Sequence, residues 1–142
     1  MPDADNEAFI QAYLDNWRRT PPDLRQVFHP EGRLLPPGRT EPLDVSGAQR
    51  LVEGTRAAIP DVALRIINWA ERDGQMFIEW EMTGTVGGKP VRWSGINRNT
   101  LRGAKSVDAV SYWDRQGLAE QIDPDAPKAD VMRLIRDASS PA

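Results

Sequence analysis

The segment of residues 61–114, DVALRIINWAERDGQMFIEWEMTGTVGGKPVRWSGINRNTLRGAKSVDAVSYWD, decides the fold of this chain. It is rich in β-branched and aromatic residues, and glycine-containing turn signals interrupt it at residues 73–74, 87–88 and 102–103. These turns predict four consecutive strands, roughly over residues 62–71, 75–86, 89–101 and 106–116. Strands joined by short hairpins form an antiparallel, strongly twisted sheet rather than alternating βαβ units.

Helical signals precede this segment. Apolar residues recur at helical spacing over residues 7–18, which predicts a first helix. A second, short helix is expected to begin at Thr20, because Asp23 completes a T-x-x-D pattern and proline is tolerated in a first turn. Pro30 is expected to end it.

A region rich in proline and glycine follows, over residues 29–45. Its composition predicts an ordered loop with no more than one short strand, around residues 33–35. Ser46, followed three residues later by Gln49, is a capping box, and it predicts a helix that Pro60 ends.

The length of 142 residues predicts a single domain over residues 1–142, with a core over about residues 6–122. A C-terminal helix is expected over about residues 127–138, packed on the sheet or on a partner subunit. Helices first and a curved sheet afterwards predict an α+β cone, in which four long antiparallel strands pack on the N-terminal helices.

Composition excludes several function classes. Lys and Arg total 18 against 21 Asp and Glu, a formal charge of −3 with no dense basic cluster, which disfavours nucleic-acid binding. The apolar runs are too short for a membrane span, so we expect no membrane association and a cytoplasmic location.

The chain has no cysteine and one histidine, His29. Disulfides, thiolate zinc sites, cysteine nucleophiles and two-histidine metal sites are therefore excluded. Chemistry is left to carboxylates, phenols, hydroxyls, amides and the basic side chains, and we expect no cofactor and no metal.

The last predicted strand carries candidate catalytic groups. Because side chains alternate along a strand, Asp108, Val110, Tyr112 and Asp114 are expected to share one face. A carboxylate in an apolar cavity has a raised pKa and can exchange a proton with a carbon acid. Six residues of extended strand separate the two aspartates by roughly 20 Å, so they cannot share a proton. Asp108 would instead bind a distant part of a ligand or a partner subunit.

The other strands are expected to supply the pocket wall. Trp80 and Met82 alternate onto one face of the second strand, and Trp93 and Asn97 onto one face of the third. The Asn97 amide could donate a hydrogen bond to a carbonyl or enolate oxygen. Tyr13, on the first helix, is either a core tyrosine or a second such donor.

Five tryptophans supply more flat apolar surface than a core of this size ordinarily needs. Either they pack the core or they line a pocket for a flat polycyclic ligand, and both interpretations stay open. The tryptophans are Trp17, Trp69, Trp80, Trp93 and Trp113.

The chain resembles the SnoaL-like polyketide cyclase branch of the nuclear transport factor 2-like superfamily. Three stretches carry the resemblance: Ile59-Pro60-Asp61-Val62, Trp80 with Thr83-Gly84-Thr85, and Tyr112-Trp113-Asp114-x-x-Gly117-Leu118. The resemblance implies a cone-shaped fold over roughly residues 8–122. It also implies that Asp114 occupies the position of the aspartate that acts as general acid/base in a metal-free intramolecular aldol closure.

Two related enzyme families match less well. Compared with ketosteroid isomerases, this chain has Tyr13 and Asn97 at or near the positions of the oxyanion donors, but it has Pro36 where the catalytic base is expected. Compared with limonene epoxide hydrolases, Asp114 of this chain matches one aspartate of an Asp-Arg-Asp relay, but its residues 79–82 lack the arginine and the second aspartate. Both mechanisms are therefore incomplete in their usual form.

The sequence predicts an enzyme that uses acid/base chemistry without a cofactor on a ketone-bearing or polyketide-like molecule, of cyclase or isomerase type. An epoxide hydrolase or ether-forming cyclase of the same fold, and a non-catalytic binding or assembly module, are the alternatives. The expected partners are a hydrophobic, polycyclic small molecule and a second copy of the chain, bound through the sheet. The expected catalytic residues are Asp114, Tyr112, Tyr13 and Asn97, and the expected substrate contacts are Trp80, Met82, Trp93, Asp108 and Val110.

Overall fold

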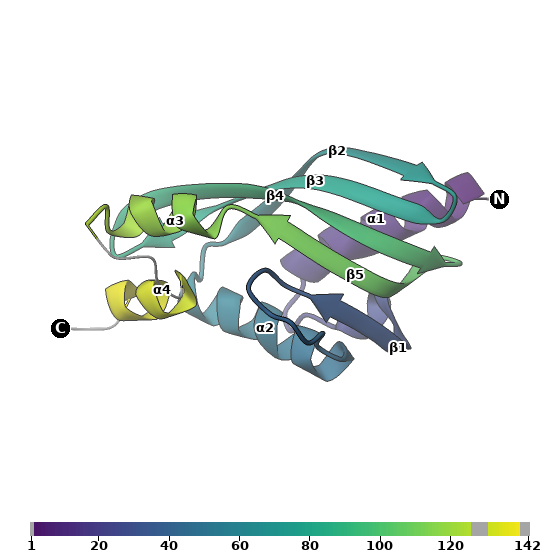
Figure 1. The fold of residues 1–142 in the computed structure, drawn as a ribbon, viewed down its shortest axis with the longest axis horizontal. Coiled ribbons are helices and arrows are strands. Elements are labelled where there is room, and N and C mark those ends of the chain that lie inside the picture. Colours follow the sequence, from purple (N-terminus) through teal and green to yellow (C-terminus); the bar gives the residue numbers. More distant parts are fainter. Residues whose placement is uncertain (1, 126–130, 140–142) are drawn as a thin grey trace.

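The computed structural model describes residues 2–125 and 131–139 (Figure 1). In chain order its elements are α1 (Pro2–Arg18), the 3-10 helix η1 (Leu24–Gln26), β1 (Phe28–Leu35), α2 (Val45–Ala58), β2 (Ala63–Arg72), β3 (Gln75–Val86), β4 (Lys89–Arg102), β5 (Lys105–Trp113), α3 (Arg115–Ile122) and α4 (Val131–Ser139).

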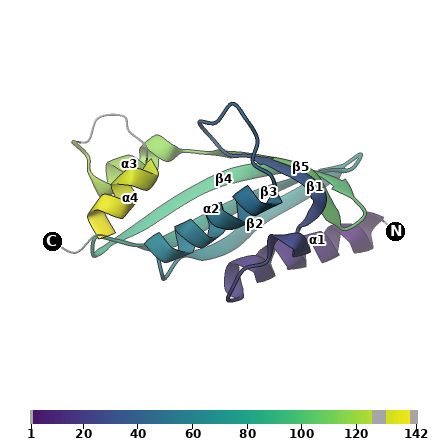
Figure 2. The ribbon, with the colours of Figure 1, turned by 90° about the horizontal axis from the view of Figure 1, so that it is seen from below.

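The strands form one sheet in the order β1-β5-β4-β3-β2. From β2 to β5 each strand pairs antiparallel with the next, as the turn signals predicted. The helices α1 and α2 cross one face of this sheet, whereas α3 and α4 gather at the end far from the N-terminus (Figure 2). The α+β cone predicted from the sequence is confirmed.

The fifth strand, β1, corrects the prediction of a loop after residue 28. It pairs parallel with β5, and its register shifts between Phe28 and Arg33. Pro30 is accommodated because β1 is an edge strand, which needs hydrogen bonds on one side only. His29 therefore lies on a strand rather than at a helix end, and its Nε2 lies 2.9 Å from the Arg102 carbonyl oxygen.

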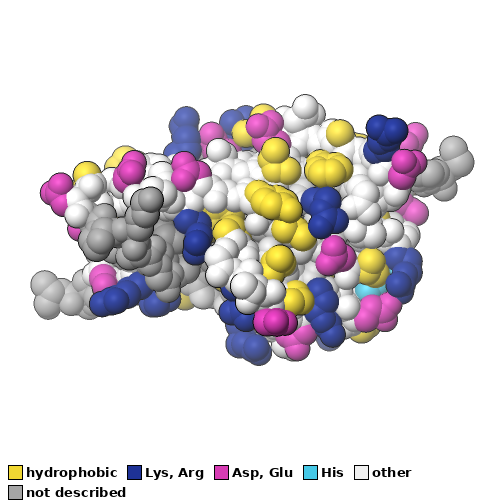
Figure 3. Space-filling view, viewed as in Figure 1, with side chains coloured by type: hydrophobic (Ala, Val, Ile, Leu, Met, Phe, Trp, Pro, Cys, Tyr) yellow, Lys and Arg dark blue, Asp and Glu magenta, His cyan; other side chains and the backbone are white. Residues whose placement is uncertain are grey.

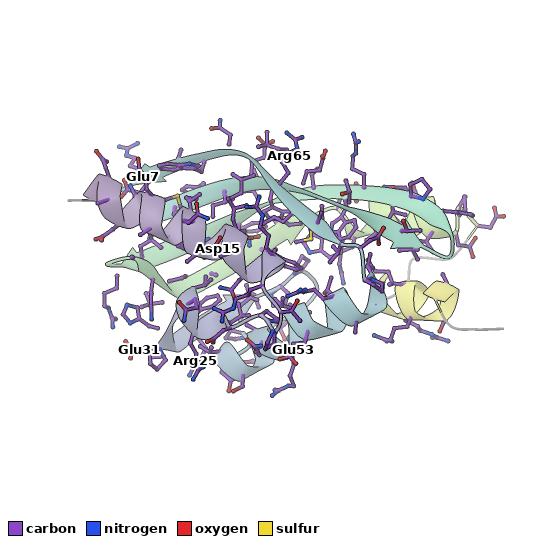
Figure 4. All side chains as sticks on the ribbon, turned by 180° about the vertical axis from the view of Figure 1, so that it is seen from behind. Glu7, Asp15, Arg25, Glu31, Glu53 and Arg65 are labelled. Carbon is purple, nitrogen blue, oxygen red and sulfur yellow. The ribbon has the colours of Figure 1, made fainter. Side chains whose placement is uncertain are left out.

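The core fills the space between the sheet and the helices. Its fully buried side chains come from α1, the end of α2, the inner face of β3, α3 and α4, and include Phe9, Ile59, Met76, Ile78, Leu118 and Ile135. Charged side chains such as Glu7, Asp15 and Glu53 point away from this space (Figure 4). The contrast matches the alternation of apolar and polar residues along each element.

The junction between α2 and the sheet is fixed by two contacts to β3. The Asp61 carboxylate accepts hydrogen bonds from the Thr85 backbone N–H at 2.9 Å and the Thr85 hydroxyl at 2.7 Å. These bonds lower the pKa of Asp61. Ile59 packs on Gly84 so closely that a Cβ at Gly84 would lie 2.4 Å from its Cγ2. The junction residues and the T-G-T stretch of β3 therefore depend on each other.

The N-caps differ from the prediction. Asp44, not Ser46, caps α2 by accepting a hydrogen bond from the Gly47 N–H at 2.8 Å. Gln49 is thereby released from the capping box, and its amide joins α2 to the segment before η1. It donates to the Pro22 carbonyl at 2.6 Å and accepts from the Leu24 N–H at 2.9 Å.

The C-terminal part contains a helix that the sequence prediction missed. The last strand ends at Trp113 instead of residue 116, and α3 begins at Arg115. Helix α4, Val131–Ser139, overlaps the predicted range of 127–138, and residues 127–130 of that range lie outside the described residues. None of the helices in the described ranges is long and apolar enough to cross a membrane.

The Gly84 contact predicts a clear difference between two glycine-to-alanine substitutions. Gly84→Ala should lower the free energy of unfolding by about 1–3 kcal/mol, because the added methyl group must displace Ile59. Gly54→Ala, on α2 with no atom within 4 Å of the added Cβ, should raise it by up to about 1 kcal/mol. Urea denaturation of the two variants measures both changes. Equal effects would show that the Ile59–Gly84 contact does not anchor α2.

Candidate active site

A pocket of about 970 Å³ lies between the inner face of the sheet and the helices. Among the described residues that line it, only four are exposed: Gly38 and Arg39 in the β1–α2 loop, and Asp114 and Arg115 at the start of α3. These four residues therefore mark the mouth. Asn99 lines it too and is buried, and it lies four residues along β4 from Gly95, which pairs with Trp113 next to Asp114. It therefore marks the inner end.

Aromatic side chains form much of the wall. Four of the five tryptophans line the pocket, and Trp93 and Trp113 contact each other with ring centroids 6.4 Å apart. Trp69, on β2, is not among the lining residues. The tryptophans therefore both pack the core and form flat surfaces around an open space. The aromatic lining residues are Tyr13, Trp17, Phe28, Trp80, Trp93 and Trp113.

A chain of hydrogen bonds crosses the pocket from the sheet to α1. The Trp80 indole Nε1–H donates to Asn97 Oδ1 at 3.0 Å. The Asn97 Nδ2 donates in turn to the Tyr13 hydroxyl oxygen at 2.8 Å. Because the indole N–H can only donate, it fixes which end of the Asn97 amide faces Tyr13.

Gly95 makes this chain of hydrogen bonds sterically feasible. It lies between Trp80 on β3 and Trp113 on β5 in the sheet register. A Cβ at this position would lie 2.7 Å from Trp80 Cζ2, 2.6 Å from Trp113 Cβ and 2.4 Å from the Tyr112 carbonyl oxygen. Only a glycine therefore allows the Trp80 indole to lie across β4 and reach Asn97.

The Tyr13 hydroxyl is left with a proton to donate. Its oxygen accepts from Asn97, and no acceptor for its own proton is found in the described part of the chain. Burial raises the pKa of Tyr13, because the phenolate would lose its hydration. The side chain is 9% exposed and lines the pocket. It is therefore a neutral phenol that can donate to a ligand oxygen.

Asn99 is a second polar group on the same face of β4, two residues farther from the mouth. It is 1% exposed and lines the pocket. Its Nδ2 has no hydrogen-bond partner among the described residues. A buried donor without a partner is rare, because the group has lost its water without compensation.

Asp114 lies at the mouth and begins α3. Its Oδ1 accepts a hydrogen bond from the Gly117 N–H at 2.8 Å, which makes Asp114 the N-cap of the helix. Gly117 is required here, since a Cβ would lie 2.5 Å from Asp114 Oδ2. Asp114 is the only carboxylate among the described residues that line the pocket.

Two arginines also line the mouth of the pocket. The Arg115 guanidinium packs on Gly38, whose φ of +83° only glycine adopts readily, and a Cβ there would lie 2.5 Å from Arg115 Nη1. Arg39 donates from Nε to the Glu41 carbonyl oxygen at 3.3 Å. In the described ranges no carboxylate lies within 4.0 Å of either guanidinium.

The structure brings together six of the nine predicted site residues. All of them line the pocket: Tyr13, Trp80, Met82, Trp93, Asn97 and Asp114.

The predicted placement of Tyr112, Asp108 and Val110 is corrected. Ala109, Ser111 and Trp113 face the pocket on β5, so these three residues point to the opposite face of the sheet. Tyr112 is 59% exposed, and Asp108 forms an ion pair with Arg98 at 3.6 Å. The assumed alternation failed because Asp114 lies beyond the end of the strand, where the chain turns into α3 and the period of two no longer applies.

Asn99, Ser111 and the two arginines were missed as pocket residues. Asn99 could have been found, since it alternates with Asn97 on the same strand face. Arg39 lies on a loop and Arg115 at the start of a helix, so the alternation of side chains along a strand could not predict which way they point.

Within the described ranges, no group of three or more His, Asp or Glu side chains could hold a metal ion.

Comparisons with known proteins agree with this architecture. The family model of the SnoaL-like domain matches residues 7–109. A comparison with curated protein sequences finds no match.

Solved structures share the fold at low sequence identity. IdmH from Streptomyces antibioticus, a proposed polyketide cyclase, is 16% identical with a TM-score of 0.76, over 82% of this chain and 97% of its own. AclR from Streptomyces galilaeus, a proposed hydroxylase, is 16% identical with a TM-score of 0.74, over 87% and 98%.

A protein with a ketosteroid isomerase-like fold from Catenulispora acidiphila, in complex with trimethylamine, is 18% identical. Its TM-score is 0.71, over 80% of this chain and 90% of its own. At these identities the likeness establishes the fold and leaves the activity to the site itself.

The buried Tyr13 can be tested by titration, because the chain contains only two tyrosines. In a Tyr112→Phe variant, the ultraviolet phenolate band should develop well above the ordinary tyrosine pKa of about 10. The free energy of unfolding should be constant up to about pH 10 and fall above it, because the unfolded phenol ionises before the folded one. Ionisation of the folded variant near pH 10 would show that the Tyr13 hydroxyl is solvated.

Proposed function

Because the chain belongs to the SnoaL-like domain family, we propose that it catalyses proton transfer on a flat, ketone-bearing small molecule bound in this pocket. The Tyr13 hydroxyl is the observation that carries the proposal: it is buried, held by Asn97 and left with a free proton. Such a hydroxyl is well suited to donate a hydrogen bond to a ligand oxygen that gains negative charge.

Tyr13 would bind the ketone oxygen and stabilise the enolate. Its oxygen is held by the Asn97 amide, and Trp80 holds that amide, so little reorganisation is needed when charge develops. Its raised pKa keeps it protonated at neutral pH, so it donates without transferring the proton to solvent. Removing one such donor from an oxyanion site costs on the order of 10²–10³ in rate.

Asp114 would serve as the base. Its carboxylate takes a proton from a carbon of the substrate, the C–H electron pair enters the conjugated system, and the negative charge reaches the oxygen held by Tyr13. Return of the proton to another carbon gives an isomer, whereas attack of the carbanion on a second carbonyl of the same molecule gives a ring.

The spacing of the two groups bears on the substrate. Asn97 pairs with Ser111 across the sheet, and Asp114 follows Ser111 by three residues, which is roughly 10 Å along extended backbone. A base at that distance suits a carbon conjugated with the ketone across a ring more than a carbon next to it. The tryptophan walls suit the flat ring system that such a conjugated ketone has.

The same observations weigh against the alternatives. An epoxide hydrolase relay needs a second carboxylate near the first, and Asp114 is the only one among the lining residues of the described chain. A purely structural module would fill its cavity with the tryptophan side chains, but these leave about 970 Å³ open. The first point weighs against the epoxide hydrolase relay, and the second favours a cavity that binds a small molecule.

Anthrone provides a direct test, because it is a flat tricyclic ketone whose acidic methylene group lies across the central ring from the carbonyl. In deuterated buffer without oxygen, the protein should accelerate exchange at that methylene, as followed by nuclear magnetic resonance. Asp114→Asn should reduce the acceleration by about 10²-fold or more. It should leave the free energy of unfolding within about 0.5 kcal/mol, because asparagine is an equally good N-cap.

Asp44→Asn is the matched control. Asp44 caps α2 with the same 2.8 Å bond to the N–H three residues on, and it does not line the pocket. This variant should retain full exchange. Full exchange in Asp114→Asn, or an equal loss in both variants, would exclude Asp114 as the base.

A second copy of the chain is the partner that the outer face of the sheet favours. Hydrophobic side chains gather in the middle of this face (Figure 3). Ile96 and Tyr112 are directly paired across β4 and β5, and Phe77 lies diagonally to Ile96 on β3. They are 43%, 59% and 43% exposed, respectively. We propose that two copies bury these rows against each other, which places the interface on the side of the sheet opposite the pocket.

Ile96→Glu tests this interface. Light scattering after gel filtration should give the parent protein twice the 15.9 kDa of one chain, and the variant one chain's mass. Ala57→Glu, which adds the same charge on the exposed side of α2, should stay dimeric. A monomeric parent protein, or a dimeric Ile96→Glu variant, would contradict the proposal.

A further inference from the structure

Two polar features of the pocket have no role in proton transfer between Tyr13 and Asp114, and they lie at its two ends. At the inner end, Asn99 is 1% exposed and its Nδ2 has no partner among the described residues. An unpaired buried amide is costly to a folded protein, because the donor has lost its water without compensation. A bound ligand with a hydrogen-bond acceptor at this end would satisfy it.

At the mouth, Arg39 and Arg115 are exposed, line the pocket and form no ion pair with the carboxylates of the described chain. The Arg115 guanidinium lies against Gly38 of the β1–α2 loop, where a side chain would occupy its place. A planar guanidinium at a pocket mouth is well suited to a carboxylate of a ligand.

We propose that the natural ligand is an elongated acid, with a carbonyl or hydroxyl oxygen that Asn99 binds at the inner end and a carboxylate that Arg115 and Arg39 bind at the mouth. The proposal rests on the proposed function in taking this pocket as the substrate site. It adds that the substrate has one neutral and one charged end, and that the neutral end enters the pocket first.

Asp114 is the opposing charge at the mouth. It lies next to Arg115 in the sequence, and one of its oxygens already accepts the Gly117 N–H. The mouth therefore carries two positive charges and one negative charge, and it still favours an anion. The competition also fixes where the carboxylate binds, on the Arg115 and Gly38 side rather than over Asp114.

The length of the pocket limits the size of the ligand. Asn99 and Gly95 are four residues apart on β4, which is roughly 13 Å of extended strand. Gly95 pairs with Trp113, and Arg115 follows two residues later. The distance matches two or three fused rings with one substituent at each end.

Three naphthalene compounds test the two ends separately by isothermal titration calorimetry. The first, 6-acetyl-2-naphthoate, has a ketone at one end and a carboxylate at the other. Its carboxamide lacks the negative charge, and 2-naphthoate lacks the ketone. The parent protein should bind the first compound about fivefold more tightly than its carboxamide. The parent protein should bind 6-acetyl-2-naphthoate about tenfold more tightly than 2-naphthoate.

Variants assign each preference to its residue. Arg115→Gln should remove the preference for the acid over the carboxamide, whereas Arg18→Gln, with the same loss of charge on α1 outside the pocket, should keep it. Asn99→Asp replaces the donor with an acceptor of the same shape and should remove the advantage of the acetyl group. Should the buried carboxylate prevent folding, Asn99→Leu removes the same donor without a charge.

Loss of each preference in its own variant alone supports the proposal. Equal binding of acid and carboxamide by the parent protein, or an acetyl advantage that survives the Asn99 variants, overturns it. Binding is measured without turnover, so the two proposals fail separately. If anthrone exchange is intact but the binding preferences are absent, only the proposal of an elongated acid as ligand is overturned. If the binding preferences are present but exchange is absent, only the proposal of proton transfer is overturned.

Discussion

The amide of Asn97 is the group on which the site depends, because it joins three elements that are distant in sequence. It accepts from Trp80 on β3, donates to Tyr13 on α1 and is itself part of β4. Because the Asn97 amide donates to the Tyr13 hydroxyl oxygen, the hydroxyl proton of Tyr13 is left to be donated elsewhere. Loss of the amide would leave an indole N–H and a phenol buried without partners, each at a cost of about 1–3 kcal/mol. Stability and function therefore constrain the same residue.

Close approaches at three glycines join the elements of the fold. Gly95 lets the Trp80 indole pass over β4, Gly84 lets Ile59 seat α2 against β3, and Gly38 lets Arg115 lie flat at the mouth. Each glycine brings two elements closer than any side chain would allow. The pocket stays open because these contacts hold the helices against the strands at particular points, while the tryptophans form a wall between them.

The sequence predicted the antiparallel meander from β2 to β5, since the turn residues that join these strands are local signals. Alternation pointed to Trp80, Met82, Trp93 and Asn97, and the resemblance pointed to Tyr13 and Asp114, and all six line the pocket. The sequence prediction failed at β1, where pairing with a strand far along the chain outweighs proline and glycine punctuation. It failed again at Tyr112, because the end of β5 is set by the Asp114 cap rather than by alternation. Neither outcome is encoded in short-range periodicity.

Asp114 is the N-cap of α3, and in the proposed function it would also serve as the base. The backbone N–H of Gly117 holds the Asp114 carboxylate at the start of α3. In the proposed reaction, a flat substrate bound between the tryptophan walls would cover this carboxylate and exclude water from it. A site built in this way needs the aromatic walls as much as it needs the carboxylate.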